Sequence, residues 1–195
     1  MRKYFLFQSN IAVLTCLLSA VFANCFAGDI VTTLTRADLA NNKHTQSNNY
    51  LTAKQAYQAL TADSKPLIFI DVRTRAEAEF VGSPLLVDGL IPYLQNDFTA
   101  WDDKERRYQK VINTNFALEL AQALRQKGLG QQAVLIFICR SGSRSAKAAN
   151  LATKLGYTQV YTVVDGFEGD TLKSGSASGQ RVLNGWKNSQ LPWVY

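Results

Sequence analysis

Residues 133–156 read AVLIFICRSGSRSAKAANLATKLG, and this stretch joins an apolar segment to a helix-like one through a short basic loop. Residues 133–138 are apolar at every position, which is typical of a strand covered on both faces of its sheet. Residues 145–156 predict a helix that ends at Gly156. A doubly covered strand that runs directly into a helix favours an α/β domain with a mostly parallel sheet.

Other strands fit the same architecture. A continuous apolar run predicts a strand at 67–70, and QVYTVV predicts another at 159–164. Residues 85–91 indicate either a short strand or a loop. Because helices are predicted between these strands, we expect one open, mostly parallel sheet with helices on both faces.

Helix starts are marked by capping boxes, in which a threonine and a residue three positions later satisfy each other's backbone donors. Thr52 and Gln55 predict the start of a helix over 51–60, and Thr74 and Glu77 predict a short second helix that Gly82 ends. An amphipathic third helix is predicted within 113–130, with Asn113 or Asn115 as its N-cap and Gly128 as its C-cap.

Residues 92–112 are the hardest part of the chain to place. The charged run WDDKERRYQK at 101–110 predicts an exposed helix or loop with a solvated face. The segment is longer than a minimal domain needs, so it is a candidate lid or partner surface.

The N-terminus is typical of a cleavable secretory signal. Two basic residues precede an apolar run at 11–23, which is shorter than the roughly 20 residues of a membrane span. Cleavage after Ala23 or Ala27 fits the small residues there, and Ala27 is preferred. We therefore expect a signal peptide at 1–27 and a periplasmic or secreted protein.

Cleavage after Ala27 leaves enough chain for one domain with its own core. Residues 28–49 are polar and predict a loose N-terminal arm, and residues 50–195 form the single domain. Trp186 and Trp193, close to the C-terminus, are expected to pack on that domain.

Charge and composition exclude several classes of function. The chain has 21 basic and 15 acidic residues, and without Arg2 and Lys3 the formal net charge is +4. The basic residues form no stripe that would bind nucleic acid. One histidine, His44, and one cysteine in the mature chain give no metal-ligand spacing. We expect no nucleic-acid partner, no metal and, after signal cleavage, no membrane partner.

Cysteine usage singles out Cys139. Cys16 lies within the predicted signal and Cys25 near its end, so Cys139 is the one cysteine expected in the mature domain. An unpaired cysteine in an oxidising compartment indicates a reactive or intermolecularly paired thiol. The alternative is a small buried side chain, because free cysteines are often buried. The count alone leaves both readings open.

The neighbours of Cys139 favour the reactive alternative. Ligands of open parallel sheets gather beyond the carboxyl ends of the strands, where Cys139 is expected. Backbone N–H groups at the start of the following helix stabilise an anion, and Arg140 and Arg144 add positive charge. Gly142 permits the positive φ that a tight loop needs. Hydrogen-bond donors are added by Ser141, Ser143 and Ser145.

CRSGSR at 139–144 resembles the active-site loop of the rhodanese sulfurtransferases. LIFIDVRTRAEAEF at 67–80 resembles the first strand of that family with its D-V-R, and GYTQVYTVVDGFEGD at 156–170 resembles its last strand and glycine-rich turn. GWKNSQLPW at 185–193 resembles the closing segment of exported single-domain members. The resemblance covers roughly residues 50–195 and implies a rhodanese-like fold.

The resemblance implies a sulfurtransferase without a cofactor. Cys139 would take the outer sulfur of a donor such as thiosulfate, release sulfite, and pass the sulfur from a persulfide to cyanide or a thiol. Arg140 and Arg144 would bind the sulfonate end of the donor or steady the loop. Asp71 would hold an arginine or shape the pocket, and Arg73 and Glu77 are predicted to form a structural ion pair. The substrate-binding residues implied are Asp71, Arg140, Ser141, Gly142, Ser143 and Arg144.

Other functions remain alternatives. The loop has six residues from Cys139 to Arg144, one fewer than the phosphatase signature, so a single sulfur fits it better than a phosphate, and phosphatase or arsenate-reductase activity is disfavoured. A persulfide carrier or anion-binding partner of a periplasmic protein, with little turnover of its own, stays open. The family's G-H-I-P-G-A segment is replaced here by GSPLLVDGLIPYLQND at 82–97, which leaves the preferred substrate open.

Overall fold

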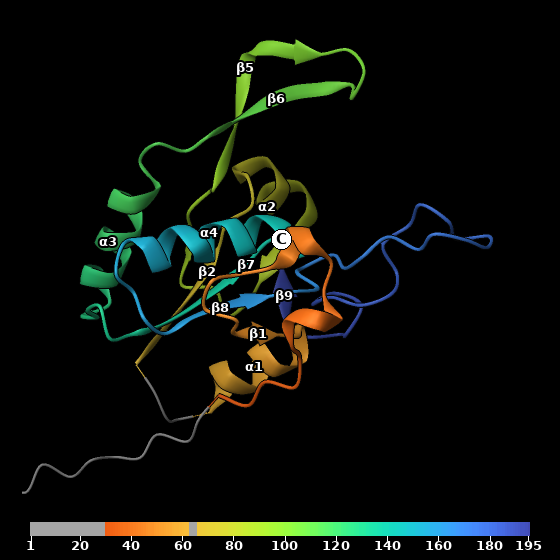
Figure 1. Ribbon diagram of the computed structural model, residues 1–195. Coiled ribbons are helices and arrows are strands. Elements are labelled where there is room, and N and C mark those ends of the chain that lie inside the picture. The colour runs from red at the N-terminus through yellow and green to blue at the C-terminus, as the bar shows by residue number, and fades with distance from the viewer. Residues whose placement is uncertain (1–29, 63–65) are drawn as a thin grey trace, which may run out of the picture.

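A computed structural model describes residues 30–62 and 66–195. Five parallel strands form the central sheet in the order β1, β8, β7, β2, β4 (Figure 1). The predicted α/β fold with a mostly parallel sheet is confirmed, and the strand that precedes Cys139 is the central one. The bounds are β1 (Tyr50–Leu51), β2 (Leu67–Asp71), β4 (Gly89–Leu90), β7 (Val134–Ile138) and β8 (Val160–Val163).

Helices cover both faces of this sheet. Leu135 and Phe137 of β7 enter the core beneath α3 and α4, whereas Val134, Ile136 and Ile138 enter the core beneath α1. Alternate side chains of one strand therefore fill two cores, which is why β7 is apolar at every position. The helices are α1 (Ala53–Thr61), α2 (Arg75–Val81), α3 (Phe116–Gln126) and α4 (Ser143–Lys154).

The predicted capping boxes are confirmed at α1 and α2. Thr52 Oγ1 accepts the N–H of Gln55 at 3.2 Å, and the Gln55 side chain accepts the N–H of Thr52 at 2.9 Å. Thr74 and Glu77 make the same reciprocal pair at 3.2 and 3.0 Å. The α2 box fixes where Glu77 projects, and that position matters for the site described below.

The segment at 92–112 is a β-hairpin, so the prediction of an exposed helix or loop there was wrong. β5 (Leu94–Asp102) and β6 (Arg107–Ile112) pair antiparallel and form a separate two-stranded sheet. The charges that suggested a helix gather at the turn, while Trp101 and Tyr108 face each other across the strands. Cross-strand aromatic pairs of this kind stabilise a hairpin. Figure 1 shows the hairpin standing away from the main sheet, above α2.

The polar arm is packed rather than loose over its described part. It contains two 3-10 helices, η1 (Arg36–Asp38) and η2 (Asn41–Lys43). Lys43 Nζ binds Asp170 at 2.7 Å, and the side chain of Asn150 in α4 bonds to the arm's backbone at Gln46. Polar side chains therefore attach the arm to the rest of the domain. The prediction of a loose arm from its low hydrophobicity was wrong for these residues.

The C-terminal segment packs on the sheet as predicted. Trp186 is fully buried and stacks on Phe69 with ring centroids 5.5 Å apart. Trp193 contacts Phe167 edge-on at 6.1 Å. Next to this contact, β9 (Trp193–Val194) pairs antiparallel with β3 (Ser83–Pro84).

The predicted signal peptide at 1–27, with Cys16 and Cys25, lies outside the described residues. Within residues 30–62 and 66–195, no helix has the length and apolar character to cross a membrane. The same residues contain no group of three or more histidine, cysteine or acidic side chains placed to hold a metal.

Candidate active site

Cys139 is the first residue after β7, and its sulfur is enclosed by the loop that follows. It is 1% exposed and is the one free cysteine of the described chain. Its Sγ accepts the N–H of Gly142 at 3.2 Å and lies 3.5 Å from Ser145 Oγ. Gly142 is the N-cap of α4, so the sulfur sits at the positive end of a twelve-residue helix. This environment stabilises an anionic sulfur.

The loop's geometry depends on Gly142. Its φ is +96°, in the region that favours glycine, and a Cβ there would collide with the carbonyl oxygen of Val164. The side chain of Lys43 lies on the same side of Gly142, with its Cδ 3.1 Å from where that Cβ would stand. The arm therefore packs against the loop, a contact that the sequence did not reveal.

Ser145 links the loop to the neighbouring strand. It is fully buried, and its hydroxyl donates to the carbonyl oxygen of Gly142 at 2.9 Å and accepts from Thr162 Oγ1 at 2.8 Å. Sequence reasoning noted Ser145 only as a small donor and missed Thr162. The alternation of side chains along β8 could have placed Thr162 inward. A buried threonine in an apolar strand needs a hydrogen-bond partner, and this could have pointed to Ser145.

Arg144 is held by Glu77 through two hydrogen bonds, of 2.6 and 2.5 Å. Burial by itself would raise the pKa of Glu77, but the hydrogen bonds and charge of Arg144 outweigh it and hold that pKa well below its ordinary value. Lys110 Nζ of the hairpin lies 3.7 Å from the same carboxylate. Because Glu77 binds Arg144, the predicted Arg73–Glu77 ion pair is wrong.

Arg73 pairs instead with Asp71, at 2.6 Å between Nη2 and Oδ2, and both side chains are fully buried. Arg73 also donates to the carbonyl oxygen of Gly82 at 2.7 Å and lies over the ring of Phe167. Asp71 thus holds an arginine, one of the two roles expected of it. The prediction paired Arg73 with the wrong carboxylate. The side chain of Arg73 turns back to Asp71 at the end of β2, so Glu77 is available to bind Arg144 of α4.

Arg140 is the exposed cation of the loop, and Ser141 and Ser143 beside it are half-buried. Burial of part of its side chain, and then the charge of Arg181, lowers the pKa of Arg140. Arg181 is fixed nearby by a 2.5 Å bond to the carbonyl oxygen of Gly169, whose own N–H donates to the Arg140 carbonyl. Among the described residues, the carboxylates of Glu77 and Glu168 act on Arg140 through their charge, but neither forms an ion pair with it.

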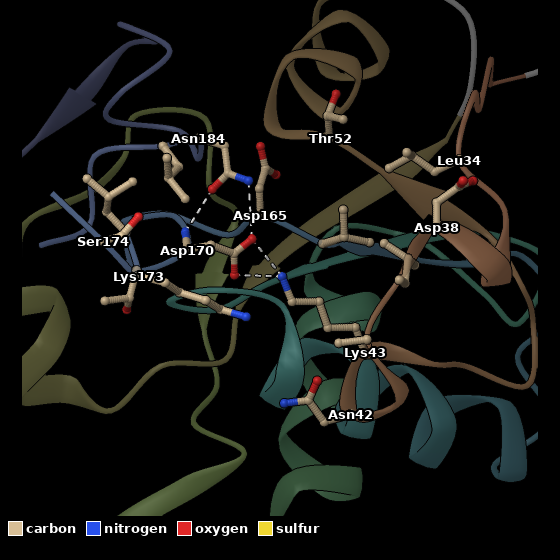
Figure 2. Close-up of a pocket in the computed structure, with 16 residues that line it drawn as sticks. Leu34, Asp38, Asn42, Lys43, Thr52, Asp165, Asp170, Lys173, Ser174 and Asn184 are labelled. Carbon is tan, nitrogen blue, oxygen red and sulfur yellow. Dashed lines mark hydrogen bonds and ion pairs between the residues drawn. The ribbon is translucent and has the colours of Figure 1, made fainter. Parts of the chain in front are cut away.

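A separate pocket lies between the arm and the loop at 170–174 (Figure 2). On its wall Lys43 binds Asp170, which Asn184 also holds through bonds of 2.8 and 3.2 Å. Burial raises the pKa of Asp165, whose carboxylate accepts N–H groups from Ala53 and Gly185. These contacts join the arm, α1 and the C-terminal segment behind the Cys139 loop.

A central parallel strand that delivers a cysteine to a six-residue loop at a helix N-terminus defines the class of rhodanese-like domains. The family model described as "Rhodanese-like domain" matches residues 52–172. The chain belongs to this family, which is a sulfurtransferase family.

Curated relatives match most of the chain. The "Uncharacterized protein RP600 homolog" of Rickettsia rickettsii is 32% identical over 148 residues, which cover 72% of this chain and 93% of that protein. The protein RC0915 of Rickettsia conorii is 31% identical over 148 residues, which again cover 72% of this chain and 93% of that protein. Among solved structures, Rv0390 from M. tuberculosis is 33% identical, with a TM-score of 0.56 over 75% of this chain and 96% of that one. The polysulfide-sulfur transferase homodimer of Wolinella succinogenes is 18% identical with a TM-score of 0.45, over 75% and 77%.

Proposed function

We propose that this chain is a sulfurtransferase that moves a sulfane sulfur from thiosulfate, or a similar anionic donor, to a thiol or cyanide through a persulfide on Cys139. The observation that carries the proposal is the 3.2 Å hydrogen bond from the Gly142 N–H to Cys139 Sγ at the start of α4. A thiolate, and the persulfide anion that replaces it, gain most from such a donor.

The reaction has two balanced steps. The Cys139 thiolate attacks the outer sulfur of thiosulfate, an S–S bond forms to Cys139, and the bond to the sulfonate sulfur breaks so that sulfite leaves with the electron pair. An acceptor thiolate or cyanide then attacks the outer sulfur of the persulfide. The Cys139 S–S bond breaks, and its electron pair returns to the Cys139 sulfur. Dividing one transfer into two displacements is covalent catalysis.

The two loop arginines have different roles in this proposal. Arg140 is free to bind the sulfonate oxygens of the donor, whereas Arg144 donates to Glu77 through both Nη1 and Nη2. Arg144 therefore steadies the loop, and its charge supports the anionic sulfur from a fixed position. Backbone N–H groups of residues 140–144 surround the persulfide.

The test is the intact mass of the purified protein after brief treatment with thiosulfate, beside a Cys139→Ser variant. We expect a gain of one sulfur in the wild type alone, which cyanide removes as thiocyanate. Rapid thiocyanate production over many cycles supports an enzyme. A persulfide that loads but turns over slowly supports the carrier alternative. No gain of sulfur, with Cys139 still open to alkylation, contradicts both.

We also propose that the protein acts outside the cytoplasm after cleavage following Ala27. The apolar run at 11–23 and the small residues after it support this location. The measurement is the N-terminal sequence of the protein recovered from a periplasmic extract, where Gly28 is expected as the first residue.

A further inference from the structure

The β5–β6 hairpin carries an apolar surface on one of its two faces. Residues directly opposite each other in an antiparallel pair share a face, as do residues two apart on one strand. Trp101 lies opposite Tyr108, and Lys110 follows two residues later. Phe98 joins the same face because its ring centroid lies 5.1 Å from that of Tyr108. We call the following residues the hairpin face: Phe98, Trp101, Tyr108, Lys110 and Ile112.

The hairpin face lies next to the Cys139 loop. Lys110 Nζ approaches Glu77 to 3.7 Å, and Glu77 in turn binds Arg144 of the Cys139 loop. Phe98 lines a hollow together with Thr74 at the start of α2. Figure 1 shows the hairpin above α2 and clear of the main sheet. A molecule that approaches Cys139 from this side therefore meets the hairpin face.

The apolar side chains of the hairpin face are exposed to solvent. Phe98 is 70% exposed, Trp101 51%, Tyr108 40% and Ile112 61%. A cluster of exposed aromatic and aliphatic groups next to a reactive centre is typical of a binding surface. A small donor such as thiosulfate gains nothing from it, because Tyr108 lies two residues, or about 7 Å, further from the loop than Lys110. The ligand that uses this face must be larger and partly apolar.

Charge defines the partner further. Lys110, Arg140 and Arg181 come from three segments and lie around the loop. Two carboxylates act on Arg140 through their charge: Glu168, and Glu77, which is already bound to Arg144. Burial lowers the pKa of Lys110, and the charges of Arg144 and Arg140 add to that effect against the opposing charge of Glu77. Positive groups that repel one another at an entrance favour the approach of a negatively charged surface.

We propose that the hairpin face docks an acidic protein that presents a cysteine to the Cys139 persulfide, so that the acceptor is a protein thiol. This inference rests on the proposed sulfurtransferase function. Apolar side chains beside the partner's cysteine contact Phe98, Trp101 and Tyr108, and its carboxylates meet Lys110 and Arg140. The partner's thiolate attacks the outer sulfur, the Cys139 S–S bond breaks, and the partner leaves as a persulfide while Cys139 regains its electron pair.

The experiment compares three synthetic peptides, each with one cysteine. The first has flanking glutamates and leucines, the second has lysines in place of the glutamates, and the third has serines in place of the leucines. The wild type, a Phe98→Thr/Trp101→Thr variant and a Leu118→Thr control are loaded with thiosulfate, and sulfur transfer to each peptide and to cyanide is timed by mass spectrometry. Threonine keeps the strand propensity of the hairpin, and Leu118 is an exposed apolar residue on α3. Calorimetry with a cysteine-to-serine form of the acidic peptide measures docking without transfer.

We expect the wild type to prefer the acidic, leucine-containing peptide over the other two. The double threonine variant should lower the ratio of the acidic-peptide rate to the cyanide rate about tenfold. It should weaken binding of the cysteine-to-serine form of the acidic peptide to a similar degree, whereas Leu118→Thr leaves the ratio unchanged. Equal rates for the acidic and basic peptides, or an unchanged ratio and binding in the double variant, overturn the docking proposal while cyanide transfer still supports the sulfurtransferase. Concentration-dependent dimerisation that the double variant abolishes overturns it in favour of a second copy of this chain. Failure to load sulfur at all overturns the proposed function, and the calorimetry then still decides whether the face binds.

Discussion

Replacing Glu77 by glutamine tests the ion pair that fixes the Cys139 loop. Glutamine keeps the capping box with Thr74, because either side chain accepts the N–H of the N-cap. What is lost is the negative charge that Arg144 and Lys110 share. The substitution therefore separates the role of Glu77 in starting α2 from its role in holding the loop.

The magnitude follows from burial. The Arg144 and Glu77 side chains are only 12% and 16% exposed, so this pair lies between a surface ion pair, worth up to about 1 kcal/mol, and a fully buried one, whose disruption costs about 3–5 kcal/mol. We expect Glu77→Gln to lower the free energy of unfolding by about 2 kcal/mol. In a domain of this size that corresponds to a fall in Tm of about 4–8 °C.

The pH dependence has a defined sign. The pKa of Glu77 is lower in the folded protein than in the unfolded chain, so its stabilisation is complete above about pH 4.3, the ordinary glutamate value, and is lost as the pH falls toward the folded pKa. Thermal unfolding followed by circular dichroism at pH 7 and at intervals down to pH 2.5 measures this. The difference in Tm between wild type and Glu77→Gln should be constant near neutrality and shrink below about pH 4.3.

Glu79→Gln is the matched control, since Glu79 lies exposed on the same helix. It removes the same charge without removing the contact to Arg144. If Glu77→Gln lowers the Tm no more than Glu79→Gln does, or if the difference between Glu77→Gln and wild type does not depend on pH, the ion pair does not stabilise the loop and the reasoning is refuted.

Three further substitutions probe the loop and its support. Gly142→Ala should reduce persulfide formation on the order of 100-fold and lower stability by about 2–4 kcal/mol, because φ is +96° and Val164 blocks a Cβ. Mass spectrometry measures persulfide formation and urea unfolding measures stability. Sulfur loading at the wild-type rate would contradict the first effect. Asp71→Asn should lower stability by about 3–5 kcal/mol, because it leaves the buried Arg73 charge without its negatively charged partner. A loss below about 1 kcal/mol in urea unfolding would show that other groups stabilise the Arg73 charge. Arg140→Ala should raise the KM for thiosulfate about tenfold with little change in kcat; steady-state thiocyanate production measures both, and an unchanged KM would exclude Arg140 from donor binding.

The sequence predicted those features whose physical cause lies within a short segment. The capping boxes of α1 and α2 involve residues three positions apart, and the stretch 133–156 contains both the strand that carries Cys139 and the helix that faces its sulfur. The hairpin was missed because its charges gather at residues 102–107, which are the turn and the two strand ends beside it, and their density there resembles that of a solvated helix. Its strand character depends on the Trp101–Tyr108 pair, which becomes visible only once the two strands are aligned.

Glu77 shows why the candidate site was predicted only in part. Local pattern identified it correctly as the third residue of α2, but its other partners, Arg144 and Lys110, stand 67 and 33 positions away. Nothing in a single sequence distinguishes Arg144 from Arg73 as the partner of this carboxylate, because both charges are available until the fold brings one of them near. The chemistry of the site resides in the contiguous loop from Cys139 to Arg144. The groups that hold and surround this loop come from the arm, α2, the hairpin and the C-terminal segment. Reactivity at Cys139 could therefore be predicted from residue types and spacing, whereas the choice of acceptor depends on surfaces that only the folded chain assembles.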